Sequence, residues 1–180
     1  MVVTLVERYN PEWPKWFERI KDYLGENISQ VCIRIEHVGS TSITGMTAKP
    51  IIDLILVIVP QDFETIKALL EERGYYHNGD QGIKDREVFR PEDISFARSI
   101  PSHHLYVCPK NSDELKRHIS FREFLKQSQK YVERLSELKW SLAEKFNNNS
   151  EAYMEGKDAL YKEITEKALE HFKDIRGHSR

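Results

Sequence analysis

Two polar features interrupt an otherwise apolar stretch of the chain and have residue types suited to chemistry: a Gly39-Ser40 turn and Asp53. Asp53 is the one polar residue in the run from 51 to 59. A buried carboxylate is costly unless it is paired, hydrogen-bonded or bound to a metal. A Gly-Ser turn that opens a helix offers backbone N–H groups and a hydroxyl to phosphate. Together these residues indicate a phosphate cradle beside a metal-binding acid.

A purely structural interpretation of the same residues stays open. Asp53 can cap a turn or pair with Lys49, which shares its strand parity. Gly39 can simply serve a tight bend, because isolated glycine turns are common. Sequence spacing does not separate these two interpretations.

The elements that would position these residues are two strands. Residues 33–38 alternate between two faces, as in a half-buried strand, whereas 51–59 is apolar on both faces apart from Asp53. The second strand is therefore expected to be central and covered on both sides.

A third strand is predicted over 102–108 and carries two adjacent histidines. Alternation places His104 and Tyr106 on one face and His103 on the other, with Leu105 and Val107. Because the apolar face should meet the helices, His104 is the candidate for a general base or a further metal ligand. A histidine that only hydrogen-bonds within the core is the alternative.

Cationic residues are the remaining candidates for binding an anion. Arg86 and Arg90 share a face within 75–97, a stretch expected to form short antiparallel strands, and guanidinium groups match phosphate well. Lys157 follows Tyr153 by four residues on the apolar stripe of a predicted helix, next to Gly156. The alternatives are a solvated hairpin face for the arginines and an outward-snorkelling stem for the lysine.

The run IEHVGSTSITGMTAKPIIDLILVI (35–58) resembles the signature of the GrpB family. Further similarity lies in HHLYV (103–107), FREFL (121–125) and EAYMEGKDALYKEI (151–164), so the resemblance spans nearly the whole chain. This family is similar in fold to the nucleotidyltransferase superfamily, whose motif is a Gly-Ser turn followed by Asp-x-Asp or Asp-x-Glu. Gly39-Ser40 and Asp53 match that motif, but Ile55 stands in place of the second acid.

The resemblance implies roles for individual residues. Gly39 and Ser40 would hold phosphates, Asp53 would bind a divalent metal such as Mg²⁺ weakly, and His104 would assist as a base or a ligand. Cationic and aromatic side chains would complete the phosphate or nucleotide site: Lys49, Arg86, Arg90, Tyr153 and Lys157. Tyr153, Gly156 and Lys157 match the family's Tyr-x-x-Gly-Lys pattern.

Length and composition predict a single domain over 1–180, because 180 residues with 39% hydrophobic content fit one core. The strand and helix patterns predict an α/β fold, and the resemblance implies a nucleotidyltransferase-like mixed sheet of about five strands within 10–108, with C-terminal helices over 111–173. A net charge of −2 argues against nucleic-acid or membrane partners. Two isolated cysteines and the lack of a signal-like or spanning segment predict a cytoplasmic protein.

Two functions fit these observations. One is binding of a nucleoside triphosphate or other phosphometabolite with metal-dependent nucleotidyl transfer, in which an acid from elsewhere in the chain, such as Glu36 or Glu87, would supply the missing ligand. The other is a non-catalytic phosphate-binding module that has lost the second carboxylate, which Ile55 favours.

Overall fold

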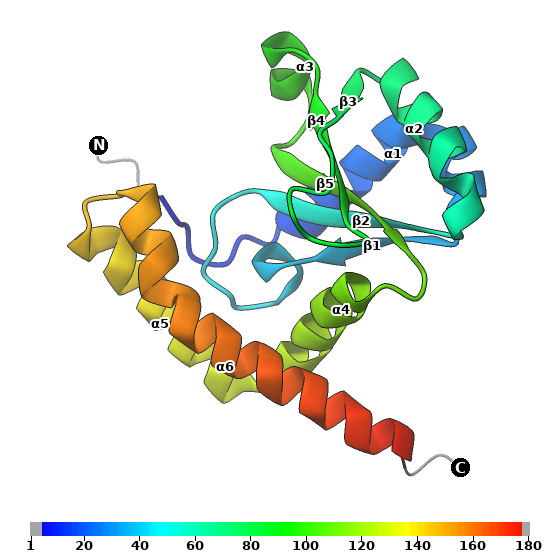
Figure 1. Cartoon of the computed structure of the whole chain (residues 1–180). Helices are drawn as coiled ribbons and strands as arrows, with labels where there is room; N and C mark the ends of the chain where they lie inside the picture. Colours follow the sequence, from blue (N-terminus) through cyan, green and yellow to red (C-terminus); the bar gives the residue numbers. More distant parts are fainter. Residues whose placement is uncertain (1–4, 178–180) are drawn as a thin grey trace.

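The computed structural model describes residues 5–177, and their side chains as far as Lys173. A five-stranded sheet forms its centre, with strand order β1-β2-β5-β4-β3 (Figure 1). The strands are β1 (Arg34–Val38), β2 (Ile52–Ile58), β3 (Tyr75–His77), β4 (Glu87–Pro91) and β5 (His103–Pro109). β2 and β5 pair in parallel and the other neighbours pair antiparallel, so the predicted mixed sheet is confirmed.

Helices cover both faces of this sheet (Figure 1). The helices are α1 (Trp13–Val31), α2 (Phe63–Glu72), α3 (Ile94–Ser99), α4 (Asp113–Lys126), α5 (Gln129–Lys145) and α6 (Ser150–Gly177). α1 and α2 pack on the face formed by alternate β2 residues such as Leu54 and Leu56. Leu115 of α4 packs on the other face, with Ile55 and Val57. The central strand is thus buried on both sides, as its composition predicted.

The three C-terminal helices share a second core that reaches back to the loop after β1. Ile43 and Met46 of that loop are almost fully buried among apolar side chains of α4, α5 and α6. The loop that follows the Gly39-Ser40 turn is therefore part of the helical layer's packing.

One stretch differs from its expected structure. Residues 75–97 were expected to form only short strands, but the chain turns into α3 at Ile94. The Asp93 carboxylate accepts a hydrogen bond from the backbone N–H of Phe96 at 2.8 Å, which caps this helix. A capping aspartate after β4 therefore overrides the strand pattern. None of the helices within residues 5–177 has both the length and the apolar run needed to cross a membrane.

Candidate functional site

The Gly39-Ser40 turn follows β1 and is held by hydrogen bonds among neighbouring residues. Gly39 has a φ of +69°, a conformation that favours glycine. The Ser42 hydroxyl donates to the Gly39 carbonyl at 2.6 Å, and the Thr41 hydroxyl lies 3.0 Å from Nε2 of His37. The turn therefore keeps its shape through its own hydrogen bonds.

The Asp53 carboxylate packs directly over the backbone of this turn. Antiparallel pairing of β1 and β2 places Val38 opposite Asp53, so Gly39 begins the turn beside that carboxylate. A Cβ atom added to Gly39 would overlap Oδ2 of Asp53. Glycine is thus required here both by backbone conformation and by the close approach of the acid.

Asp53 and His104 form a hydrogen-bonded pair on one face of the sheet. Parallel pairing of β2 and β5 sets the two residues side by side, and Nδ1 of His104 lies 2.8 Å from Oδ1 of Asp53. A carboxylate only accepts, so Nδ1 carries the proton. Nε2 has no hydrogen-bond partner among the described residues, and 47% of the His104 side chain is exposed. The pair therefore leaves the second ring nitrogen, Nε2, facing solvent.

His103 lies on the opposite face, as strand alternation predicted. Its Nε2 is 2.8 Å from the Tyr75 hydroxyl, and its Nδ1 is 2.8 Å from the Pro101 carbonyl. Both ring nitrogens are therefore used within the fold, which gives His103 a structural role.

Lys139 of α5 reaches the Gly39-Ser40 turn from the helical layer. Its side chain is buried, and its Nζ donates to the Ser40 hydroxyl at 2.6 Å and to the Thr47 carbonyl at 3.1 Å. Burial, together with repulsion from Lys157, lowers the pKa of Lys139 to about 7, although Asp53 acts in the opposite direction. A buried ammonium group thus stands at the cradle, bonded to neutral oxygens only.

Lys49 and Lys157 extend this cationic cluster. Both amines lie over the Tyr153 ring, 5.2 and 5.7 Å from its centroid, and Lys49 also donates to the Ser150 hydroxyl at 2.9 Å. Burial lowers the pKa of each, and Lys49 lowers that of Lys157 further. Lys49 therefore bonds to Ser150 rather than pairing with Asp53. Within the described part of the chain, none of the three lysines forms an ion pair with a carboxylate.

Gly156 lets α6 approach α5 closely beside this cluster. A Cβ atom at Gly156 would lie 2.5 Å from Cδ2 of Leu142. Gly156 therefore serves the packing of α6 against Leu142 of α5. The next residue, Lys157, lies over the rings of Tyr153 and Tyr161.

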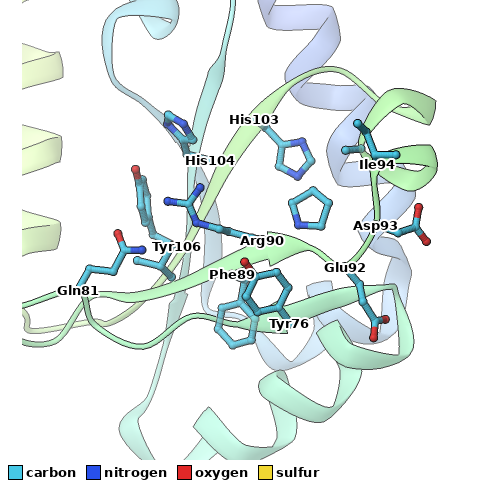
Figure 2. Close-up of a pocket in the computed structure, with 13 residues that line it drawn as sticks. Tyr76, Gln81, Phe89, Arg90, Glu92, Asp93, Ile94, His103, His104 and Tyr106 are labelled. Carbon is cyan, nitrogen blue, oxygen red and sulfur yellow. The ribbon is translucent and has the colours of Figure 1, made fainter. Parts of the chain in front are cut away.

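The two arginines differ in their surroundings. Arg86 lies 3.9 Å from the buried Glu114 carboxylate and stacks over the Tyr106 ring, so its charge is already balanced within the fold. Arg90 is exposed on β4, beside His104 and Tyr106 (Figure 2). Of the two arginines, Arg90 is the one whose guanidinium group has no ion-pair partner among the described residues.

Among the described side chains, no second carboxylate is free to join Asp53 in a metal site. Ile55 is fully buried in the cluster under α4. Glu36 pairs with Arg34 and Arg122. Glu87 pairs with His77. Neither glutamate is thus available as the missing acid.

The donor set does not fit a metal pair held by the protein. Among the side chains that the structure describes, residues 5–173, no three His, Cys, Asp or Glu come together as a metal site. Mg²⁺ prefers six oxygen ligands, and one Asp53 oxygen already accepts from His104. The predicted Asp53 metal site therefore lacks the ligands that a protein-held Mg²⁺ pair needs.

Lys139 is the site residue that the sequence reasoning missed. It lies four residues after Leu135, on the buried stripe of α5. A lysine on an apolar stripe was the signal that singled out Lys157, and the same signal was present at Lys139.

The fold is similar to that of a nucleotidyltransferase-class enzyme. It matches a structure of the Cid1 poly(U) polymerase bound to MgATP with a TM-score of 0.50, at 13% identity, over 73% of this chain and 42% of that one. At this identity the likeness concerns the fold alone.

The chain belongs to the GrpB family, whose model, described as GrpB protein, matches residues 3–167. GrpB from Enterococcus faecalis has a crystal structure that matches with a TM-score of 0.79, at 30% identity, over 93% of this chain and 98% of that one. The Glutamate-rich protein GrpB of Alkalihalophilus pseudofirmus is 32% identical, over 87% of this chain and 90% of its own. UPF0157 protein YqkA of Bacillus subtilis is 31% identical over 89% of this chain, which spans only 46% of that relative.

Proposed function

We propose that this protein binds a phosphorylated small molecule, with a nucleoside triphosphate as the leading candidate, where the Gly39-Ser40 turn meets the lysines of the helical layer. The lysine cluster carries the proposal: Lys139 donates to Ser40, and Lys49 and Lys157 lie together over the Tyr153 ring. Burying a cation such as Lys139 without a paired counter-charge is costly. A polyphosphate would supply the missing negative charge.

The state of Lys139 supports an anionic ligand in particular. Its pKa of about 7 means that the amine is only partly charged near neutral pH. An anion against Ser40 and Lys139 favours the protonated amine, so binding is coupled to proton uptake. The affinity should therefore increase as pH falls from 8.5 to 6.5.

Nucleotidyl transfer is the second candidate, and the Asp53–His104 pair favours it. With Nδ1 donating to Asp53, Nε2 of His104 is the ring nitrogen that would take a proton from an acceptor hydroxyl. That oxygen would then attack the α-phosphate, and pyrophosphate would leave. Mg²⁺ would arrive with the triphosphate, because the described side chains near the turn offer a metal little more than Asp53.

Binding is tested by thermal shift and titration calorimetry with ATP and inorganic tripolyphosphate, each with and without Mg²⁺. A ligand at 100 times its Kd stabilises a protein by about 2.7 kcal/mol, which raises Tm by several degrees. Lys157→Ala should weaken binding about 10- to 100-fold, because it removes a charge-assisted contact. Lys162→Ala, an exposed lysine on the same helix, is the matched control and should bind normally.

The outcomes separate the candidates. No stabilisation by any polyphosphate, with protein free of bound ligand, would overturn both. Pyrophosphate release by wild type that disappears in Asp53→Asn would establish transfer over a non-catalytic module. Binding without pyrophosphate release from any of a panel of hydroxyl acceptors would favour the module.

A further inference from the structure

Four side chains form a row across the sheet at one level. Asp53 pairs with His104, and Tyr76 pairs with Arg90. Val88 pairs with Tyr106, which places Arg90, two residues further along β4, beside His104. Neighbouring strands lie about 4.8 Å apart, so the row runs about 14 Å from Asp53 to Tyr76. It begins at the phosphate cradle and ends at the opposite edge of the sheet.

A hollow of about 450 Å³ occupies the outer part of this row (Figure 2). Its lining includes Tyr76, Arg90, His104 and Tyr106, together with Ile94 at the start of α3. Figure 2 shows the Arg90 side chain turned toward His104 and Tyr106. The volume falls within the range of small-molecule sites.

The lining of the hollow combines aromatic rings, such as those of Tyr76 and Tyr106, with the positive charge of Arg90 on the side nearer Asp53. Tyr76 is 42% exposed and Ile94 is 68% exposed, so both side chains are accessible to a ligand in the hollow. The Arg90 guanidinium group has no carboxylate partner within the described residues. Burial raises the pKa of the Tyr106 hydroxyl, and the nearby charge of Arg90 acts in the opposite direction. Guanidinium planes and aromatic rings stack on planar ligands and tolerate many ring types.

We propose that this hollow is a specificity subsite for a planar heteroaromatic group, such as a nucleobase, which stacks on Tyr76 and Arg90 and hydrogen-bonds to the Arg90 guanidinium group. The inference rests on the proposed function, because the row joins the hollow to the phosphate cradle through Asp53 and His104. The ring belongs either to the phosphorylated ligand itself or to a second molecule bound beside it.

The experiment compares ATP, tripolyphosphate alone, and adenosine added to protein saturated with tripolyphosphate. Calorimetry is done on wild type, Tyr76→Ala, Arg90→Ala and Arg19→Ala. Arg19 is an exposed arginine of α1, on the other side of the sheet, and serves as the control. The subsite predicts that ATP binds at least about tenfold more tightly than tripolyphosphate, since stacking one base is worth that much or more.

The source of the ring follows from which arm the substitutions affect. If both Tyr76→Ala and Arg90→Ala remove the advantage of ATP, and Tyr76→Ala leaves tripolyphosphate binding unchanged, the ring is on the phosphorylated ligand. If they instead abolish adenosine binding beside tripolyphosphate, the ring is on a second molecule.

The subsite is overturned if both substitutions leave ATP and adenosine binding unchanged while tripolyphosphate still binds in a Lys157-dependent way. That result would leave the phosphate site intact. Failure of tripolyphosphate to bind wild type would instead count against the proposed function itself.

Discussion

Nζ of Lys139 lies 2.6 Å from Oγ of Ser40, although 99 residues separate them in the chain. The contact joins α5 to the turn after β1. It places an amine whose pKa is close to neutral at the point where a phosphate oxygen would bind. The behaviour of this amine is therefore the most direct probe of the site.

Replacing Lys139 by methionine should change how stability depends on pH. The folded-state pKa of about 7 is below the ordinary value of 10.5, so between these values the unfolded chain binds more protons than the folded one. Stability of wild type should thus rise with pH in this window. Relative to Lys139→Met, the rise should be about 2 kcal/mol from pH 7 to pH 9.

Urea unfolding of both proteins at several pH values measures this difference. Tyrosine and cysteine titrations are common to both proteins and cancel in the comparison. A difference that stays constant from pH 6 to pH 9 would contradict the lowered pKa.

Gly39→Ala should both destabilise the protein and weaken phosphate binding. The added Cβ meets the Asp53 carboxylate, and the backbone has a φ that alanine disfavours. Strain of this kind costs about 1–3 kcal/mol. Gly79→Ala is the control, because Gly79 has a φ of +68° with open space around its Cβ position. A loss of stability in Gly39→Ala no larger than in Gly79→Ala would show that Asp53 does not crowd the turn.

The hydrogen bond to Asp53 should fix the tautomer of His104. Nitrogen NMR above pH 8 should find the proton on Nδ1 in wild type and a substantial Nε2–H population in Asp53→Ala. His103 is an internal control, since its Nδ1 faces the Pro101 carbonyl in either protein. An unchanged His104 spectrum in the variant would remove Asp53 as its orienting partner.

Restoring the motif acid by Ile55→Asp should cost several kcal/mol of folding stability. Ile55 is fully buried among Val38, Val57 and Leu115, where a carboxylate has no partner. Ile55→Val should cost only about 1 kcal/mol. If the aspartate variant folds, we expect Mg²⁺ to strengthen its nucleotide binding. Stability equal to wild type without metal would mean that the cluster under α4 is more open than its packing indicates.

Strand alternation and the family motif predicted much of the fold and one half of the site. The parity of 51–59 and 102–108 correctly placed Asp53 and His104 on one face and His103 on the other, because side-chain direction alternates along a strand. Local residue order was sufficient for these statements.

The other half depends on long-range packing. Nothing in the order of residues states that Lys139 meets Ser40, that Glu36 binds Arg122, or that Arg86 is bound to Glu114. These contacts arise because α4, α5 and α6 fold back over the sheet, and parity within one element says nothing about such distances. The helix at Ile94 was missed for a local reason, the capping role of Asp93.

Ile43 and Met46 belong to the core of α4, α5 and α6, although they lie only a few residues beyond β1. The cradle is consequently anchored in two layers at once, by Asp53 on the sheet side and by these apolar side chains on the helical side. If the sheet and the helical layer separated, Ile43 and Met46 would lose their contacts with α4, α5 and α6. In hydrogen–deuterium exchange, amides of the loop should therefore open together with the three helices, and a bound ligand should slow both to the same extent.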